Sequence, residues 1–132
     1  MGALLAGATR RLIEEERPLL EGHGLTMWGY IALSRLAEEP AASQLLLAES
    51  MGYDKTRLIT LLDALEADGL ITREPDPDDR RARVIALTPT GRKLHRAARR
   101  SVRTMEKRLL SGIGEADVQR LRDILGRLAG PG

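Results

Sequence analysis

The chain has 132 residues, of which 42% are hydrophobic, so it is long enough for one core but small for two independent ones. It contains no cysteine, which excludes disulfides, thiolate nucleophiles and cysteine metal ligands and fits a reducing cytoplasm. The formal charge is only +2, so binding to an anionic partner must depend on where the charges cluster.

The N-terminal residues lack the basic stretch and long apolar run of a signal peptide, and no segment approaches transmembrane length. We therefore expect a cytoplasmic protein with no membrane partner. Phenylalanine is absent, so the core must be built from Leu, Ile, Val and Ala, which suits helices.

The N-terminal segment predicts a helix, because apolar residues recur in it at helical spacing. These residues are Leu4, Leu5, Ala8, Leu12 and Ile13. Pro18 and the segment 22–24, which contains two glycines, are expected to loosen or interrupt this helix. Thr26 then suits the N-cap of a second helix, which should end at Glu39 before Pro40.

Residues 43–69 predict two helices joined at a glycine. A short helix begins after Ser43 and ends at Gly52, which permits the turn that follows. Asp54 is a good N-cap for the next helix, and Gly69 supplies its left-handed stop. Four leucines spaced i, i+3, i+4 and i+7 form one apolar stripe for the core, namely Leu58, Leu61, Leu62 and Leu65.

The opposite face of this second helix carries polar side chains near its N-terminal end, where a recognition helix presents groups to base edges. The expected DNA contacts here are Ser43, Gln44, Asp54, Lys55, Thr56, Arg57 and Thr60. Arginine can pair with the acceptors of guanine, and threonine offers a hydroxyl and a methyl group. Taken alone, the same pattern describes a solvated amphipathic helix. Its position after a glycine turn and before a hairpin favours DNA binding.

The next segment predicts a β-hairpin that forms a wing. Residues 70–74 and 83–87 are strand-like and flank a turn-rich tip at residues 75–81. Arg73, Arg80, Arg81 and Arg83 are the cations expected to contact DNA. The alternative is a salt-bridged surface turn, because the hairpin contains four acidic residues that balance these charges.

A long helix should follow the wing, with Thr88 as its cap and Pro89 in its first turn. Its buried side is marked by Leu94, Ala98, Val102, Met105 and Leu109, and a last helix after Glu115 carries Val118, Leu121, Leu125 and Leu128. The long helix also carries a basic cluster, Arg92, Lys93, Arg96, Arg99, Arg100, Arg103, Lys107 and Arg108. This cluster could contact phosphates, hold an anionic effector, or be a solvated face paired with the acidic residues 14–16.

These segments together resemble the multiple antibiotic resistance regulator (MarR) family of winged helix-turn-helix proteins. The resemblance is carried by residues 25–26, 47–55, 65–73, 76–82 and 87–91. It implies a mainly α fold with a small β wing and with N- and C-terminal dimerisation helices. The corresponding division is an N-terminal dimerisation helix and loop at 1–25, a DNA-binding region at 26–90 and C-terminal dimerisation helices at 91–132, all in one compact unit.

The resemblance also assigns roles within the wing. In the family, an aspartate and an arginine two positions apart hold a guanidinium for entry into the minor groove, which corresponds here to Asp79 and Arg81. A carboxylate fixes the planar guanidinium, and a narrow groove concentrates negative potential. Arg80 and Arg83 are expected to touch phosphates instead.

The function predicted from these features is sequence-specific transcriptional regulation on double-stranded DNA. Apolar stripes on the terminal helices need a cover, and the resemblance implies a homodimer paired through the first and last helices. We expect a repressor that binds a pseudo-palindromic operator and is released by a small-molecule effector. The alternative is a winged-helix module that binds a protein partner without operator-specific DNA binding.

The resemblance also implies an effector cleft between the dimerisation helices and the winged domain, where we expect a small aromatic or anionic effector. The expected pocket residues are Arg11, His23, Trp28 and Tyr30, although aromatic residues at helical spacing are more often core. His23 and His95 are isolated, so we expect a loop residue and a helix-surface residue rather than metal ligands. We expect neither an enzyme nor a bound cofactor, because the sequence contains no pattern of a nucleophile with its base or of paired acids in a pocket.

Overall fold

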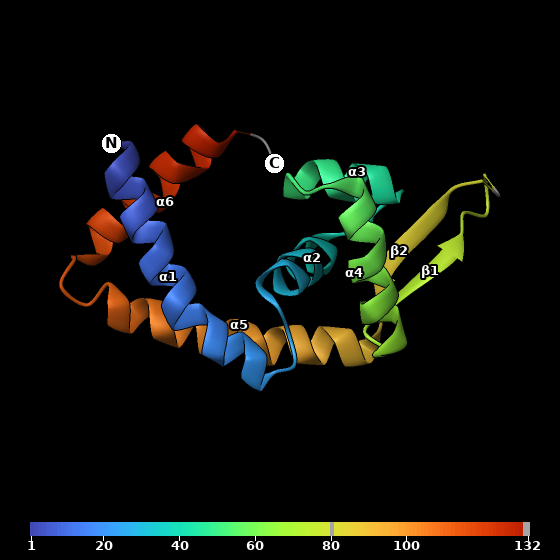
Figure 1. The fold of residues 1–132 in the computed structure, drawn as a ribbon, viewed down its shortest axis with the longest axis horizontal. Helices are drawn as coiled ribbons and strands as arrows, with labels where there is room; N and C mark the ends of the chain where they lie inside the picture. The colour runs from blue at the N-terminus through green and yellow to red at the C-terminus, as the bar shows by residue number, and fades with distance from the viewer. Residues whose placement is uncertain (80, 131–132) are drawn as a thin grey trace.

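The computed structural model describes residues 1–79 and 81–130, which form helices and a two-stranded antiparallel sheet at one end of the molecule (Figure 1). In chain order the elements are α1 (Gly2–Gly22), α2 (Met27–Glu38), α3 (Gln44–Met51), α4 (Lys55–Ala67), β1 (Ile71–Pro75), β2 (Arg83–Leu87), α5 (Pro89–Leu109) and α6 (Glu115–Ala129). The prediction of a mainly helical fold with a small β wing is confirmed. Arg80, Pro131 and Gly132 lie outside the described residues.

Four helices begin at N-caps with a side-chain hydrogen bond, and three of these caps, Thr26, Asp54 and Thr88, are predicted from the sequence. The side-chain oxygen of each cap accepts a hydrogen bond from a backbone N–H three residues later, which satisfies one of the free amides of the first turn. The caps are Thr26, Ser43, Asp54 and Thr88. Gly52, with φ of 63°, and Gly69, with φ of 74°, adopt the left-handed conformation expected after α3 and α4.

α1 differs from the prediction, because it continues through Pro18 to Gly22. Proline removes one backbone hydrogen bond and crowds the preceding turn, which usually interrupts a helix. Here Leu20, which is 1% exposed, and the half-buried Leu19 pack into the core just after the proline. The packing of this last turn therefore outweighs the local preference.

The core lies where α2, α4, α5 and the base of the hairpin meet. Leu33 of α2, Leu58 and Leu62 of α4, and Ile85 of β2 are fully buried there. β1 and β2 pair in register from Ile71 opposite Leu87 to Pro75 opposite Arg83, and Ala41 adds a single bridge to Ile85. The hairpin is thereby held at its base and projects its tip away from the core.

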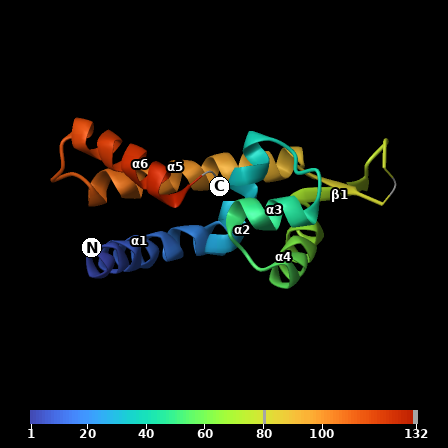
Figure 2. The ribbon, with the colours of Figure 1, turned by 90° about the horizontal axis from the view of Figure 1, so that it is seen from above.

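The two ends of the molecule have different surfaces. Figures 1 and 2 show α1 and α6 at one end and the hairpin at the other, with α5 running between them. α6 has no buried residue, and large apolar side chains are exposed along α1 and α6, including Leu4, Leu121, Ile124, Leu125 and Leu128. Within the described part of the chain, no helix has the length and apolar character needed to cross a membrane.

Candidate nucleic-acid interface

The first turn of α4 presents three neighbouring polar side chains to solvent. Lys55, Thr56 and Arg57 are exposed, whereas Leu58 and Leu62 on the opposite side are fully buried. One face of the helix is therefore anchored in the core while the other is free to enter a groove. Thr60 is also exposed, one turn further along. Its neighbour Ile59 is 40% exposed and offers an apolar contact that the sequence reading did not include.

The side chain of Asp54 caps this helix by binding its backbone. Its Oδ2 accepts a hydrogen bond from the N–H of Arg57 at 2.9 Å, which fixes the first turn of α4. A side chain used in this way positions Lys55 and Arg57 and is not itself free for a base. Asp54 therefore orients the predicted DNA-contacting residues of α4.

The start of α3, the helix that precedes α4 in the chain, contains Gln44, with Ser43 directly before it. The hydroxyl of Ser43 accepts a hydrogen bond from the N–H of Leu46 at 3.1 Å, so this serine is the helix cap. The Oε1 atom of Gln44 is buried and has no hydrogen-bond partner among the described residues. Leu45 and Leu46 are 47% and 54% exposed. Leucines are usually buried, so two exposed leucines on this surface are unexpected. The sequence analysis predicts no role for them.

The acidic residues of the wing tip organise the backbone. Asp79 Oδ1 accepts from the N–H of Arg81 at 3.0 Å, and Asp76 Oδ1 accepts from the N–H of Asp78 at 2.8 Å. The resemblance had suggested that Asp79 holds a guanidinium. In the structure its carboxylate instead holds the backbone of Arg81, whose side chain is exposed. Arg80, which was also predicted to contact DNA, lies outside the described residues.

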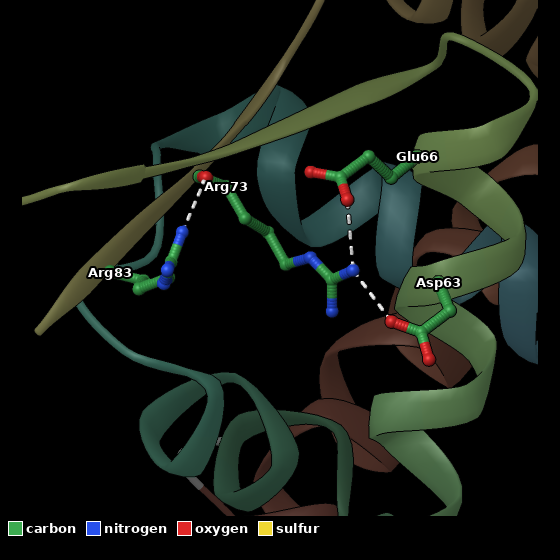
Figure 3. A network of polar contacts seen from close by, with 4 residues as sticks. All are labelled: Asp63, Glu66, Arg73 and Arg83. Atoms are coloured by element: carbon green, nitrogen blue, oxygen red, sulfur yellow. Dashed lines mark hydrogen bonds and ion pairs between the residues drawn. The ribbon is translucent and has the colours of Figure 1, made fainter.

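Arg73 is placed differently from the other predicted contacts. Its Nη2 atom lies 2.6 Å from Oδ1 of Asp63 and 2.9 Å from Oε1 of Glu66, both on α4 (Figure 3). Its side chain is only 15% exposed, and its hydrogen bond lowers the pKa of Glu66. This guanidinium therefore points toward α4 and connects it to the wing. Arg83, which is exposed, donates from Nη1 to the backbone oxygen of Arg73 at 3.4 Å.

The basic side chains at the two proposed contact regions carry uncompensated charge. Within the described residues, Lys55, Arg57 and Arg81 form no ion pair with a carboxylate. Of the arginines that the salt-bridged alternative would pair, Arg81 and Arg83 form no ion pair among the described residues, whereas Arg73 pairs with two carboxylates of α4. Exposed, unpaired cations on a helix end and a hairpin tip can approach phosphates without first losing a partner.

Three of the four residues predicted to form an effector pocket contact residues of other segments, and two of these contacts are with α5. The ring of Trp28 lies 4.5 Å from that of Tyr53, and the ring of Tyr30 lies 5.6 Å from that of His95. His23 Nε2 is 3.1 Å from the hydroxyl of Ser101.

A cavity of about 170 Å³ lies nearby, and none of the four predicted residues, which include the exposed Arg11, lines it. The residues that line this cavity are Ile13, Glu16, Arg17, Leu20, Glu21, Leu25, Thr26 and Met27. Burial, followed by the nearby carboxylate of Glu106, raises the pKa of Glu16. The cavity therefore combines four apolar side chains with polar and charged ones, among them the carboxyl group of Glu16 with its raised pKa.

His95 was expected on the helix surface, and this prediction is wrong. It is 5% exposed, and its Nε2 lies 2.9 Å from the hydroxyl of Ser34 on α2. Burial, followed by the charges of Arg99 and Arg92, lowers its pKa. The spacing held the signal, since His95 is in helical phase with Gly91, Ala98, Val102 and Met105, which are all buried.

Comparison with known proteins places this geometry in a family. The sequence profile of the MarR family matches residues 25–82. A MarR-family transcriptional regulator from Rhodococcus sp. RHA1 is 31% identical, with a TM-score of 0.89 over 99% of this chain and 94% of that one. CouR from Rhodococcus jostii RHA1, bound to p-coumaroyl-CoA, is 30% identical, with a TM-score of 0.86 over 98% and 91% of the two chains.

A second structure of CouR is directly relevant to the surface described above. The transcriptional repressor CouR bound to a 23-mer DNA duplex is 30% identical, with a TM-score of 0.90 over 98% of this chain and 92% of that one. The identity, the coverage of both chains and the shared winged helix-turn-helix lead to one conclusion. This chain belongs to the MarR family, whose members are transcriptional regulators rather than enzymes.

Proposed function

We propose that this regulator is a homodimeric repressor that recognises a pseudo-palindromic operator through α4 and the wing. The observation that carries the proposal is the first turn of α4, where Lys55, Thr56 and Arg57 are exposed above the buried Leu58 and Leu62. A helix anchored in this way presents rigid side chains at the depth of a major groove. The related repressor CouR, which has been solved on a DNA duplex, supports the same use of the fold.

The predicted contacts divide into three groups by the role that we propose for each. The base-reading group is Lys55, Thr56, Arg57 and Thr60, with Asp54 fixing its backbone. Ser43 and Gln44 at the start of α3, together with Arg80 and Arg83 of the hairpin, make the phosphate-contacting group. Arg81 enters the minor groove from the wing tip. We assign Arg73 a positioning role, because its guanidinium is held by two carboxylates of α4.

Dimerisation follows from the terminal helices, residues 1–25 and 91–132. Leu121 and Leu125 are 41% and 40% exposed on α6, and Leu4 is 79% exposed on α1. A second copy that covers these side chains buries apolar area and pairs the two recognition helices about a two-fold axis. Two recognition helices related in this way fit half-sites whose centres lie about 34–36 Å apart, which is one turn of DNA. Such a protein acts in the cytoplasm, on the DNA it regulates.

A small-molecule effector releases the repressor by favouring a dimer shape whose wings no longer match the operator. A ligand can act only through unequal affinity for two such shapes. The related CouR has been solved with p-coumaroyl-CoA, which is both aromatic and anionic. The cavity between α1 and the start of α2 is one entry point for a ligand. A second candidate site for the ligand is the surface near the four residues predicted from the sequence, Arg11, His23, Trp28 and Tyr30.

A titration of the protein against its own upstream DNA tests the proposal. Fluorescence anisotropy is followed at several salt concentrations, with a random duplex as competitor. Tight binding by a dimer that resists the competitor is the expected result. Arg57→Glu and Arg81→Glu should each abolish this preference while size-exclusion chromatography still shows a dimer.

The matched control is Arg127→Glu, which makes the same charge change on α6, away from α4 and the wing. Binding no tighter than to random DNA, across a genomic library as well as the upstream fragment, would reject operator recognition. That outcome would favour the alternative use of the winged helix as a protein-interaction module.

A further inference from the structure

α5 carries a continuous basic stripe that the proposed operator contacts do not use. We define the basic stripe as Arg92, Lys93, Arg96, Arg99, Arg100, Arg103 and Lys107, all of which are exposed. The opposite side of the same helix carries the buried residues Gly91, His95, Ala98, Val102 and Met105. α5 runs from the base of the wing to the end of the molecule that carries α1 and α6 (Figures 1 and 2). The basic stripe therefore extends along the outer surface of the molecule for nearly the whole helix.

Members of the basic stripe have no acidic partner among the described residues. Glu106 is the acidic residue of α5, and it pairs with Arg122 of α6 at 3.1 Å. The expected pairing of the cluster with residues 14–16 of α1 is not observed, since no ion pair joins these acids to α5 in the described chain. The charge of the stripe is thus available to a partner outside the chain.

The basic stripe does not help α5 to fold. Cations three or four positions apart on a helix repel one another, and the stripe repeats this spacing from Arg92 to Lys107. Arg92 also lies in the first turn, and Lys93 directly follows it, where the helix dipole disfavours positive charge. The fields of Arg99 and Arg92 reach the core, because both lower the pKa of His95. Because the basic stripe destabilises α5, we infer that its charges serve an interaction with a partner outside the chain.

The shape of the stripe suits a long polyanion. From Arg92 to Lys107 the helix rises by about 22 Å, at about 1.5 Å per residue. A DNA strand presents a phosphate about every 3.4 Å, so this length corresponds to about six or seven phosphates. Small ligands need a concave site that covers most of their surface. Arg100 lines a hollow with Glu15 and Leu19 of α1, but the stripe extends along α5 well beyond that hollow. A lipid surface needs exposed apolar side chains, and those of α5 face the core.

We propose that the basic stripe binds the sugar–phosphate backbone of duplex DNA outside the half-site read by α4 and the wing. This inference rests on the proposed function, because it takes DNA as the polyanion that the regulator meets. The backbone comes either from DNA that flanks the operator or from a second duplex. Contacts of this kind carry no sequence information, and they strengthen binding in a salt-dependent way.

The test compares two variants of the full-length protein. In the first, Arg96, Arg99 and Arg103 are all replaced by glutamine, which removes three charges from the middle of the stripe. In the second, the same residues are replaced by lysine, which keeps the charges. Both variants are titrated at several salt concentrations with three probes: the operator alone, the operator with long random flanks, and a random duplex.

The expected result is that the glutamine variant binds the operator alone as wild type does and loses the gain in affinity that the flanks give. On flanked DNA, the slope of log affinity against log salt should be smaller in magnitude for this variant, by about one to three per protomer. Each lost phosphate contact lowers the magnitude of that slope by about 0.9. The lysine variant should retain wild-type behaviour. Binding of labelled random duplex to the complex with the short operator identifies the second-duplex source, and a gain confined to flanked DNA identifies the flanks.

Unchanged salt slopes and affinities of the glutamine variant on flanked and random DNA overturn the inference, even when operator recognition is intact. Failure of the proposed function looks different, because wild type then shows no preference for the operator over the random duplex. In that case the glutamine variant must still bind random DNA more weakly than the lysine variant. Equal binding of both variants to random DNA rejects the basic stripe as a DNA-binding surface.

Discussion

The guanidinium of Arg73 lies 2.6 Å from the carboxylate of Asp63 and thereby joins the first strand of the wing to the recognition helix (Figure 3). Glu66, one turn further along α4, contacts the same nitrogen at 2.9 Å. In the proposed complex, the exposed face of α4 and the wing tip enter adjacent grooves together, so their relative angle determines whether both fit. Arg73 holds that angle from a position where its side chain is 15% exposed.

Replacement of Arg73 by methionine should weaken operator binding more than it weakens the fold. Asp63 and Glu66 are 60% and 42% exposed, so water can solvate them when the guanidinium is removed. We expect a loss of about 1 kcal/mol in the free energy of unfolding, as for a partly exposed pair. Operator affinity should fall by about tenfold, which is about 1.4 kcal/mol, because the wing is less well positioned.

Chemical denaturation and fluorescence anisotropy measure these two effects separately. The control is Arg120→Met, whose pair with Asp117 is longer, at 3.8 Å, and exposed at both ends. This variant should match wild type in both measurements. Wild-type operator affinity in Arg73→Met would remove the positioning role.

Gly91 is required where α5 crosses the start of the wing. A β-carbon at this position would overlap the backbone carbonyl of Leu70, which cannot move without disturbing β1. Gly91→Ala should therefore lower the free energy of unfolding by about 1–3 kcal/mol, as an overpacked core site does. Gly126→Ala in α6 meets no atom within 4 Å and should raise helix stability by about 1 kcal/mol. A pair of denaturation curves checks both signs, and a stable Gly91→Ala variant would contradict the close approach.

Sequence patterns were most reliable where the governing interactions are local. The caps Thr26, Asp54 and Thr88 each accept a hydrogen bond from an amide three residues away, so their chemistry is readable from neighbouring residues. The stripe of α4 was also correct, apart from Leu61, which is only half-buried. The exposed face of that helix followed directly from the same periodicity.

Features that depend on contacts between distant segments were missed. The continuation of α1 beyond Pro18 depends on Leu20 packing into a core built from other elements. The direction of Arg73 depends on two carboxylates that only the folded chain brings to it. His95 was misplaced because its polarity was given more weight than its spacing. Side chains respond to such tertiary surroundings, so local patterns locate them on an element without giving their partners.

The burial of His95 predicts a pH dependence of stability with a definite sign. Its pKa in the folded chain is below the ordinary value of 6.5, so the unfolded chain takes up the proton first as the pH falls. Its contribution is complete above about pH 6.5 and is lost as the pH falls through the lowered pKa. The groups that face the ring are Ser34 and Tyr30 of α2 and the charges of Arg99 and Arg92 on α5.

His95→Gln isolates this effect, because glutamine can still hydrogen-bond to Ser34 without taking up a proton. Between pH 6.5 and 5 the wild-type free energy of unfolding should fall more steeply than that of the variant, by up to about 1.4 kcal/mol per pH unit. Urea denaturation at closely spaced pH values measures the difference. Glu16 acts with the opposite sign, since its raised pKa makes stability fall as the pH rises, and it is common to both proteins. Parallel curves would show that His95 does not titrate differently in the folded chain.

The apolar face of α6 provides the sharpest test of the dimer. Leu121 and Leu125 are 41% and 40% exposed and lie outside the core, so their replacement by arginine should leave the protomer folded. If a second copy covers them, each protomer loses about 1–2 kcal/mol per leucine, which weakens the dimer by at least about a thousandfold. Operator binding should fall with it, because a single recognition helix reads only one half-site. Analytical ultracentrifugation gives the oligomeric state, and circular dichroism confirms that the helices remain. Gln119→Arg introduces the same side chain away from the apolar face and should stay dimeric. A double variant that remains a dimer at low micromolar concentration would place the interface on another surface.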